Sequence, residues 1–161
     1  MMKVFTISAL LTLTVFTLVT FIACNKNECQ NISCKNGGTC SDGTCSCATG
    51  YKGKLCDELE RDVLLGSYSG NTGGSTYTIT IVAGIGDVDF KVNNFSNWGN
   101  ATGYWTSSGS SIPEQSLGGG LMVRNGKITL TGTSIKITYE EFFSGIGGGT
   151  WVATTFNGTK I

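Results

Sequence analysis

The sequence predicts an all-β chain in which a small disulfide-rich module precedes an antiparallel β-barrel or β-sandwich of about eight strands, after a cleaved signal peptide. Three observations predict this organisation. The first two dozen residues are rich in apolar side chains and carry a single charge, all seven cysteines lie between positions 24 and 56, and apolar residues alternate with polar ones beyond Val63. Changes in composition set the expected ranges, which are a signal peptide over 1–23, a tether over 24–28, a cysteine module over 29–57, a linker over 58–63 and an all-β domain over 64–161.

The overall composition argues against several functions. Eleven basic and 11 acidic residues give a net charge of zero, and no dense basic run offers an electrostatic footprint for nucleic acid. The chain has no histidine, which removes the commonest general base near neutral pH and the commonest imidazole metal ligand. We therefore expect a protein that is not an enzyme, that carries no cofactor and that has no nucleic-acid partner.

The N-terminal segment has the layout of a secretory signal. Lys3 gives a positive start, and the stretch from Val4 to Ala23 contains no charge. It ends in Phe21-Ile22-Ala23-Cys24, which resembles the lipobox of bacterial lipoproteins. The resemblance implies that Cys24 is diacylated and becomes the new N-terminus. Setting Cys24 aside also leaves an even number of six cysteines for the module behind it.

The alternative is an uncleaved membrane anchor, because about 20 apolar residues are enough to cross a bilayer. On that interpretation Cys24 is a free thiol or an intermolecular partner just outside the membrane. Both interpretations place the rest of the chain in an extracytoplasmic space. The lipobox favours a protein of the cell envelope, at the outer membrane or the cell surface, that is held on the membrane by its N-terminal lipid.

Six cysteines form a dense pattern in a segment too short to bury a core. Gaps of four, five, four, one and eight residues separate them. In an exported chain such crowding predicts a disulfide framework, and the spacing leaves its connectivity open. A zinc site is disfavoured, because exported thiols meet oxidants and the single residue between Cys45 and Cys47 is not the usual spacing of a zinc knuckle.

The segment from Glu28 to Glu58 resembles an EGF-like domain of the compact, tenascin-type variety. The resemblance depends on the cysteine spacing, on Asn36-Gly37-Gly38-Thr39 before the third cysteine and on Gly50-Tyr51-Lys52-Gly53 before the last. It implies three disulfide bonds, which are Cys29 with Cys40, Cys34 with Cys45, and Cys47 with Cys56.

A calcium site in this module has weak candidates. EGF-like modules that bind calcium carry acidic or amide oxygens just before the first cysteine, where this chain has Asn25, Asn27 and Glu28, and Asp42 adds another oxygen. The alternative is that these polar residues tether the module to the membrane. We favour the tether and expect no bound metal, because few of the oxygens are charged.

The densest charge run in the chain follows the last cysteine. It extends from Asp57 to Asp62 and separates two regions of different composition. A charge run of this length is typical of a solvated spacer, so we expect a linker between two modules, with at most one helical turn.

Beyond Val63 the pattern is that of half-buried strands. Ile135, Ile137 and Tyr139, for example, alternate with lysine, threonine and glutamate. The strands expected from such alternation cover residues 66–69, 75–82, 87–93, 101–106, 111–115, 121–124, 127–131 together with 134–140, and 150–157. Glycine-rich and asparagine-rich segments separate them, and Asn125-Gly126 is the strongest hairpin signal among these.

Gly66-Ser67-Tyr68 at the first strand, together with the series of hairpins, resembles the lipocalin-like barrels of small Bacteroidetes lipoproteins. The resemblance implies a barrel whose interior is either packed or holds one small apolar ligand. A β-sandwich remains the alternative.

Candidate functional residues in the all-β domain are aromatic rather than acidic. Trp98 lies in a loop rich in asparagine and glycine, and we expect Trp98, Tyr104 and Trp105 to contact a ligand, since exposed aromatics stack on sugars or anchor partner proteins. The competing interpretation places Tyr104, Trp105 and Trp151 partly in the core. The five carboxylates at Asp87, Asp89, Glu114, Glu140 and Glu141 are expected at the surface, so we predict no catalytic residue.

We therefore expect an anchored binding or adhesion protein, with a protein or glycan as its ligand. One alternative is a lipocalin-like carrier of a small apolar ligand, which would need a cavity of at least about 300 Å³. A second alternative is a carbohydrate-active enzyme, which would need two carboxylates that converge in a cleft.

Overall fold

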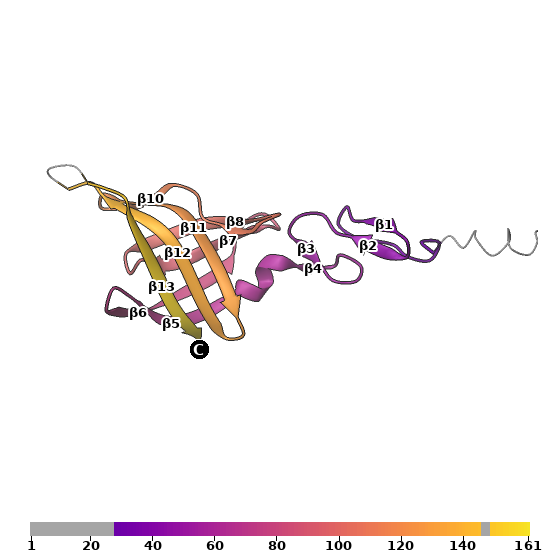
Figure 1. Ribbon diagram of the computed structural model, residues 1–161, viewed down its shortest axis with the longest axis horizontal. Helices are drawn as coiled ribbons and strands as arrows, with labels where there is room; N and C mark the ends of the chain where they lie inside the picture. The colour runs from indigo at the N-terminus through magenta and orange to yellow at the C-terminus, as the bar shows by residue number, and fades with distance from the viewer. Residues whose placement is uncertain (1–27, 146–148) are drawn as a thin grey trace, which may run out of the picture.

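The computed structural model describes residues 28–145 and 149–161, and within them it confirms an all-β fold (Figure 1). The expected signal peptide, the lipobox with Cys24, and Asn25 lie outside the described residues. Within the described residues, strands account for all the regular structure apart from one 3-10 helix. None of the described helices is long and apolar enough to cross a membrane.

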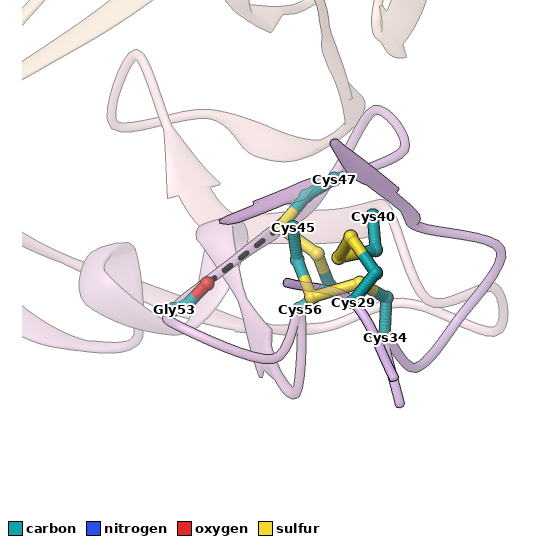
Figure 2. Close-up of a disulfide and its surroundings, with 7 residues drawn as sticks. All are labelled: Cys29, Cys34, Cys40, Cys45, Cys47, Gly53 and Cys56. Carbon is teal, nitrogen blue, oxygen red and sulfur yellow. Dashed lines mark hydrogen bonds between the residues drawn. A yellow bond between two sulfur atoms is a disulfide. The ribbon is translucent and has the colours of Figure 1, made fainter. Parts of the chain in front are cut away.

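Three disulfide bonds hold the cysteine module together (Figure 2). They join Cys29 to Cys40, Cys34 to Cys45, and Cys47 to Cys56, the same pairs that the EGF-like resemblance implies. Three such bonds indicate an oxidising, extracytoplasmic environment.

Two small hairpins complete the module. Strand β1 (Thr39–Ser41) pairs with β2 (Thr44–Ser46) across Asp42 and Gly43, which both have positive φ, as a tight hairpin turn requires. Strand β3 (Tyr51–Lys52) pairs with β4 (Glu58–Leu59), which lies beyond the last cysteine.

The segment expected as a linker with one helical turn forms a short strand and a 3-10 helix. Glu58 and Leu59 form β4, and the 3-10 helix η1 (Glu60–Leu64) follows immediately. Arg61 of η1 is only 8% exposed and donates hydrogen bonds to the carbonyl oxygens of Gly86, between β6 and β7, and of Asp89, the first residue of β7. The helix η1 is the one helical turn that the sequence allowed here, and the burial of Arg61 joins it to the sheet.

A single antiparallel sheet of nine strands forms the rest of the chain. The strands are β5 (Gly66–Thr72), β6 (Ser75–Ala83), β7 (Asp89–Phe95), β8 (Gly99–Thr106), β9 (Gly109–Ser111), β10 (Gln115–Gly118), β11 (Leu121–Thr131), β12 (Ser134–Phe143) and β13 (Val152–Lys160). Their order across the sheet is β10-β11-β12-β13-β5-β6-β7-β8-β9, so the last strand of the chain pairs with the first strand of the sheet. This single curled, barrel-like sheet excludes the β-sandwich.

The two edges of the sheet meet near its seam. Ile112, just after β9, forms an antiparallel bridge with Gly126 of β11 through two backbone hydrogen bonds of 2.8 and 2.9 Å. The Ser110 hydroxyl lies within hydrogen-bonding distance of both the amide and the carbonyl of Ile128. These contacts satisfy backbone groups that an open edge would expose.

The expected hairpin at Asn125-Gly126 is wrong. The two residues lie inside β11, where the register shifts between Arg124 and Lys127, so the expected strands 121–124 and 127–131 are one bulged strand. Asn125 has a φ of 54°, a conformation that suits a bulge as well as a turn. A side chain on Gly126 would collide with Ile112, so this glycine permits the close approach at the seam.

The inward faces of the strands form one packed core. Its aromatic members include Tyr68, Phe90 and Phe156, all at most 1% exposed. The ring of Tyr77 lies 5.1 Å from that of Phe156, and Phe95 lies 4.6 Å from Tyr139. The interior of the sheet is therefore occupied by large side chains along much of its length.

The alternating direction of the strands divides their connections between two ends. The distal end carries the β5–β6, β7–β8, β10–β11 and β12–β13 connections. The proximal end carries η1 and the β6–β7, β8–β9 and β11–β12 connections. The cysteine module contacts the proximal end, so it and the distal end lie at opposite ends of the long axis (Figure 1).

Candidate binding site at the distal end

Trp98 occupies the turn between β7 and β8 at the distal end. Ser96 and Asn97 just before it both have positive φ, which turns the chain sharply. The indole Nε1 donates a 2.9 Å hydrogen bond to the carbonyl of Gly118, and the ring lies against Gly119, where a Cβ would be 2.7 Å from Cζ2. The glycines of the β10–β11 connection therefore make room for the indole and fix its orientation.

Phe143, the last residue of β12, lies beside Trp98. The two ring centroids are 6.1 Å apart, and the rings meet at 79°, edge to face. Trp98 is 55% exposed and Phe143 is 53% exposed, and Val152 at the start of β13 is also 55% exposed. A pair of exposed aromatic rings in contact with each other is typical of an interaction site.

Below these rings, polar side chains extend from the sheet interior to the distal end. The Tyr139 hydroxyl donates to Ser96 Oγ at 3.1 Å, and Ser96 Oγ donates to Glu141 Oε2 at 3.0 Å. Tyr139, Glu141 and Phe143 follow one another on the inward face of β12, because alternate residues of a strand share a face. A hydroxyl-to-hydroxyl contact of 2.9 Å between Thr72 and Tyr77 lies at the same end.

The two phenols are held in their neutral form. Burial raises the pKa of Tyr139 strongly, and the nearby charge of Glu141 raises it further, against the hydrogen bond to Ser96. Burial likewise raises the pKa of Tyr77, and the charge of Glu141 adds to the effect. Both hydroxyls therefore remain protonated at neutral pH and able to donate hydrogen bonds.

The negative charge of Glu141 has no basic partner among the described residues. Arg124, the nearest basic residue in the neighbouring strand, points to the outer face and pairs with Glu140 at 2.7 Å. This hydrogen bond lowers the pKa of the Glu140 carboxyl. The Arg124 guanidinium also lies 4.1 Å from the ring centre of Trp151, which packs beside Phe142 on that outer face.

The three aromatic residues expected to contact a ligand do not come together. Trp98 lies at the distal end, whereas Tyr104 and Trp105 lie near the proximal end of β8. Trp105 packs against the core, and Tyr104 is exposed and lines an open cleft of about 510 Å³ together with Ile85 and Lys91. The three predicted residues therefore lie at two opposite ends of the sheet and do not form one site.

The remaining candidates are also dispersed. Asp87 accepts a hydrogen bond from Tyr51 of the cysteine module, and Asp89 accepts one from the Gly86 amide, both at the proximal end. Glu140 and Glu141 point to opposite faces of β12. Glu28, a calcium candidate, packs against Gly43, next to Asp42. In the described parts of the chain, no group of three or more acidic, cysteine or histidine side chains is placed to hold a metal ion.

Sequence reasoning missed Phe143, Ser96 and the role of Glu141. Glu141 and Phe143 continue the alternation of Ile135, Ile137 and Tyr139, so the period of the strand places both on its inward face. That signal was present in the sequence. No local signal links Ser96 to Glu141, because 45 residues separate them.

The exposed rings of Trp98 and Phe143 provide a surface for stacking, and Glu141 provides a single negative charge. Such a surface is suited to binding a ligand. Comparisons of this chain with protein families, with curated protein sequences and with solved structures find no match.

Proposed function

We propose that this chain is a lipid-anchored protein of the bacterial cell envelope that binds a ligand without catalysis and presents its distal end to that ligand. The observation that carries the proposal is the position of Trp98 and Phe143, two large exposed rings at the end of the molecule opposite the cysteine module. Cys24 directly precedes the cysteine module in sequence, and that module lies at the opposite end of the long axis from the distal connections of the sheet (Figure 1), so an anchor at Cys24 would leave the distal end facing away from the membrane.

The anchor is supported by the number of cysteines. Six of the seven are joined in three disulfides, which leaves Cys24 at the end of an apolar segment as the one cysteine outside the framework. Two acyl chains on this residue would hold the protein stably on a membrane. Intact-mass measurement of the membrane-extracted protein tests this directly. A chain that begins at Cys24 with added acyl mass is expected, and a retained Met1 would contradict it.

The EGF-like module serves, on this proposal, as a rigid stalk. Three interactions connect it to the proximal end: the β3–β4 pairing that leads into η1, the hydrogen bonds of Arg61, and a 2.5 Å hydrogen bond from Tyr51 to Asp87. A stalk docked in this way would fix the orientation of the barrel-like sheet relative to the anchor. This favours display of the distal end over a freely swinging tether.

Surface binding is favoured over the alternative of an interior carrier, because the cleft of about 510 Å³ beside Tyr104 is open to solvent at the proximal end and is not an enclosed cavity. Phe95, Tyr139 and Phe156 fill the sheet interior toward the distal end, and polar groups of Ser96 and Glu141 lie above them. An apolar ligand that entered there would have to displace both the rings and a hydrogen-bonded carboxylate.

The test of binding uses the full exported chain on arrays of glycans and host-matrix proteins. Trp98→Ala is compared with Tyr104→Ala, since each removes an exposed aromatic side chain and the two lie at opposite ends of β8. The proposal predicts that Trp98→Ala lowers binding to the captured ligand at least about tenfold and that Tyr104→Ala does not, as hot-spot aromatics typically carry such a loss. Equal binding by the two variants would contradict it.

A further inference from the structure

We infer that the corner between the rings of Trp98 and Phe143 binds a methylated ammonium group, with Glu141 supplying the opposite charge. The inference rests on the proposed function, because it names the chemistry of the ligand that the distal end would bind. It depends on three features of the described residues. These are the angle between the two rings, the charge of Glu141 that no described basic residue pairs with, and the hydrogen bonds that Ser96 and Tyr139 already make.

The rings form a preorganised corner. They meet at 79° with their centres 6.1 Å apart, and both remain more than half exposed. The hydrogen bond from Trp98 Nε1 to Gly118 and the contact with Gly119 fix the indole before any ligand arrives. Aromatic faces attract cations through the negative charge density above the ring, and tryptophan does so most strongly.

The charge at this end is uncompensated. Glu141 accepts one neutral hydrogen bond, from Ser96, and no described lysine or arginine pairs with it. The four distal connections, residues 73–74, 96–98, 119–120 and 144–151, contain no lysine or arginine in their sequence. The chain therefore cannot supply a counter-ion from these connections, and a ligand that bears a positive charge is the complement of the site.

The hydrogen-bonding groups select the type of cation. A primary ammonium carries three N–H donors and needs acceptors for them, whereas a methylated ammonium needs none. Ser96 Oγ already accepts a hydrogen bond from Tyr139, and Glu141 Oε2 already accepts one from Ser96, so few acceptors remain here for the three N–H donors of a primary ammonium. Two aromatic faces and one carboxylate therefore favour a cation that is held by charge and ring contact over one that is held by hydrogen bonds.

The experiment is isothermal titration of the full exported chain with choline chloride and with 3,3-dimethylbutan-1-ol, which has the same shape as choline but no charge. Saturable binding of choline and binding of the alcohol at least about tenfold weaker are expected. Choline affinity should also fall as salt rises, because the site contributes a full charge. Equal affinity for the two compounds, or no saturable heat with choline, would overturn the inference.

Two matched variants locate the site. Glu141→Gln removes the charge but retains an oxygen that accepts the Ser96 hydrogen bond, so the fold is kept, and a loss of about tenfold in choline affinity is expected. Glu140→Gln removes the neighbouring charge on the opposite face and should leave choline affinity unchanged. Equal effects of the two variants would overturn the assignment to Glu141.

Two further results separate this inference from the proposed function. Nα-acetyl-lysine amide serves as a primary ammonium probe, and tighter binding of this compound than of choline would overturn the choice of a methylated cation. If choline does not bind while Trp98→Ala still abolishes capture of a glycan or matrix protein, this inference fails and the proposed function stands. If neither binding is seen, both fail.

Discussion

Ser96 Oγ donates a 3.0 Å hydrogen bond to Glu141 Oε2 across 45 residues of sequence. This contact ties the β7–β8 turn, which carries Trp98, to the end of β12, which carries Phe143. This hydroxyl group therefore adds to the contacts of Trp98 with Gly118 and Phe143 that hold the distal end together.

Ser96→Ala should destabilise the protein by about 1–2 kcal/mol, because the buried Tyr139 hydroxyl loses its acceptor. Urea unfolding measures the change in the free energy of unfolding. Thr129→Ala on the exposed outer face removes a hydroxyl of similar size and is expected to change stability by no more than about 0.5 kcal/mol. Equal effects would show that the buried network contributes little.

Gly119→Ala should move the Trp98 indole. Gly119 has a φ of +57°, and an added Cβ would lie 2.7 Å from the ring. Gly73→Ala is the matched control, since Gly73 has a φ of +54° and nothing within 4 Å of its Cβ position. Both variants should lose about 1 kcal/mol of stability through backbone strain. Only Gly119→Ala should also change tryptophan emission and iodide quenching, and an unchanged spectrum would contradict this account of how the ring is held.

Arg61→Met should loosen the joint between the cysteine module and the sheet. The carbonyl groups of Gly86 and Asp89 lose a charged donor, which is expected to cost about 2 kcal/mol. Limited proteolysis should then cleave near η1 faster than in the wild type. Tyr51→Phe, which removes only an exposed hydrogen bond to Asp87, is expected to have little effect. Resistance of Arg61→Met to cleavage would show that other contacts hold the joint.

Alkaline pH should destabilise the fold through Tyr139. Burial raises the pKa of this phenol above its usual value of 10.0, so above that pH the folded chain retains a proton that the unfolded chain releases. The contribution to stability is therefore complete below about pH 10 and is lost as the pH rises toward the folded-state pKa. Unfolding free energies measured between pH 9 and pH 11 should fall less steeply in Tyr139→Phe than in the wild type. Tyr104→Phe, which changes an exposed tyrosine, should keep the wild-type slope.

Much of the fold could be predicted from local pattern. Alternation along Ile135, Ile137 and Tyr139 identifies a strand because its period is the period of the backbone itself. The cysteine cluster likewise predicts a disulfide framework from density alone. These features depend on neighbours in sequence, so the sequence displays them directly.

The errors arose where distant residues decide the structure. Asn125 and Gly126 have the composition of a hairpin turn, but Ile112 bridges to Gly126 and keeps the strand continuous. Arg61 lies in a charge run, but it is buried and donates hydrogen bonds to the carbonyl groups of Gly86 and Asp89. In each case a partner between 14 and 28 residues away along the chain outweighs the local preference.

Of the residues at the candidate site, only Trp98 was predicted from the sequence. Trp98 was found because an aromatic residue in an asparagine-rich and glycine-rich loop is unusual, whereas Tyr104 and Trp105 share a strand that carries them to the other end. Eight residues of extended chain span roughly 25 Å, so neighbours in sequence on one strand do not form one site.

Hydrogen–deuterium exchange of the full exported chain, with and without its captured ligand, tests the central claim most directly. Binding at the distal end predicts slower exchange in the β7–β8 turn around Trp98, in the Gly118–Gly120 segment and at the end of β12 near Phe143, with the β6–β7 connection unchanged. Protection confined to the cysteine module or to the cleft beside Tyr104 would contradict the claim that the distal end is the binding surface.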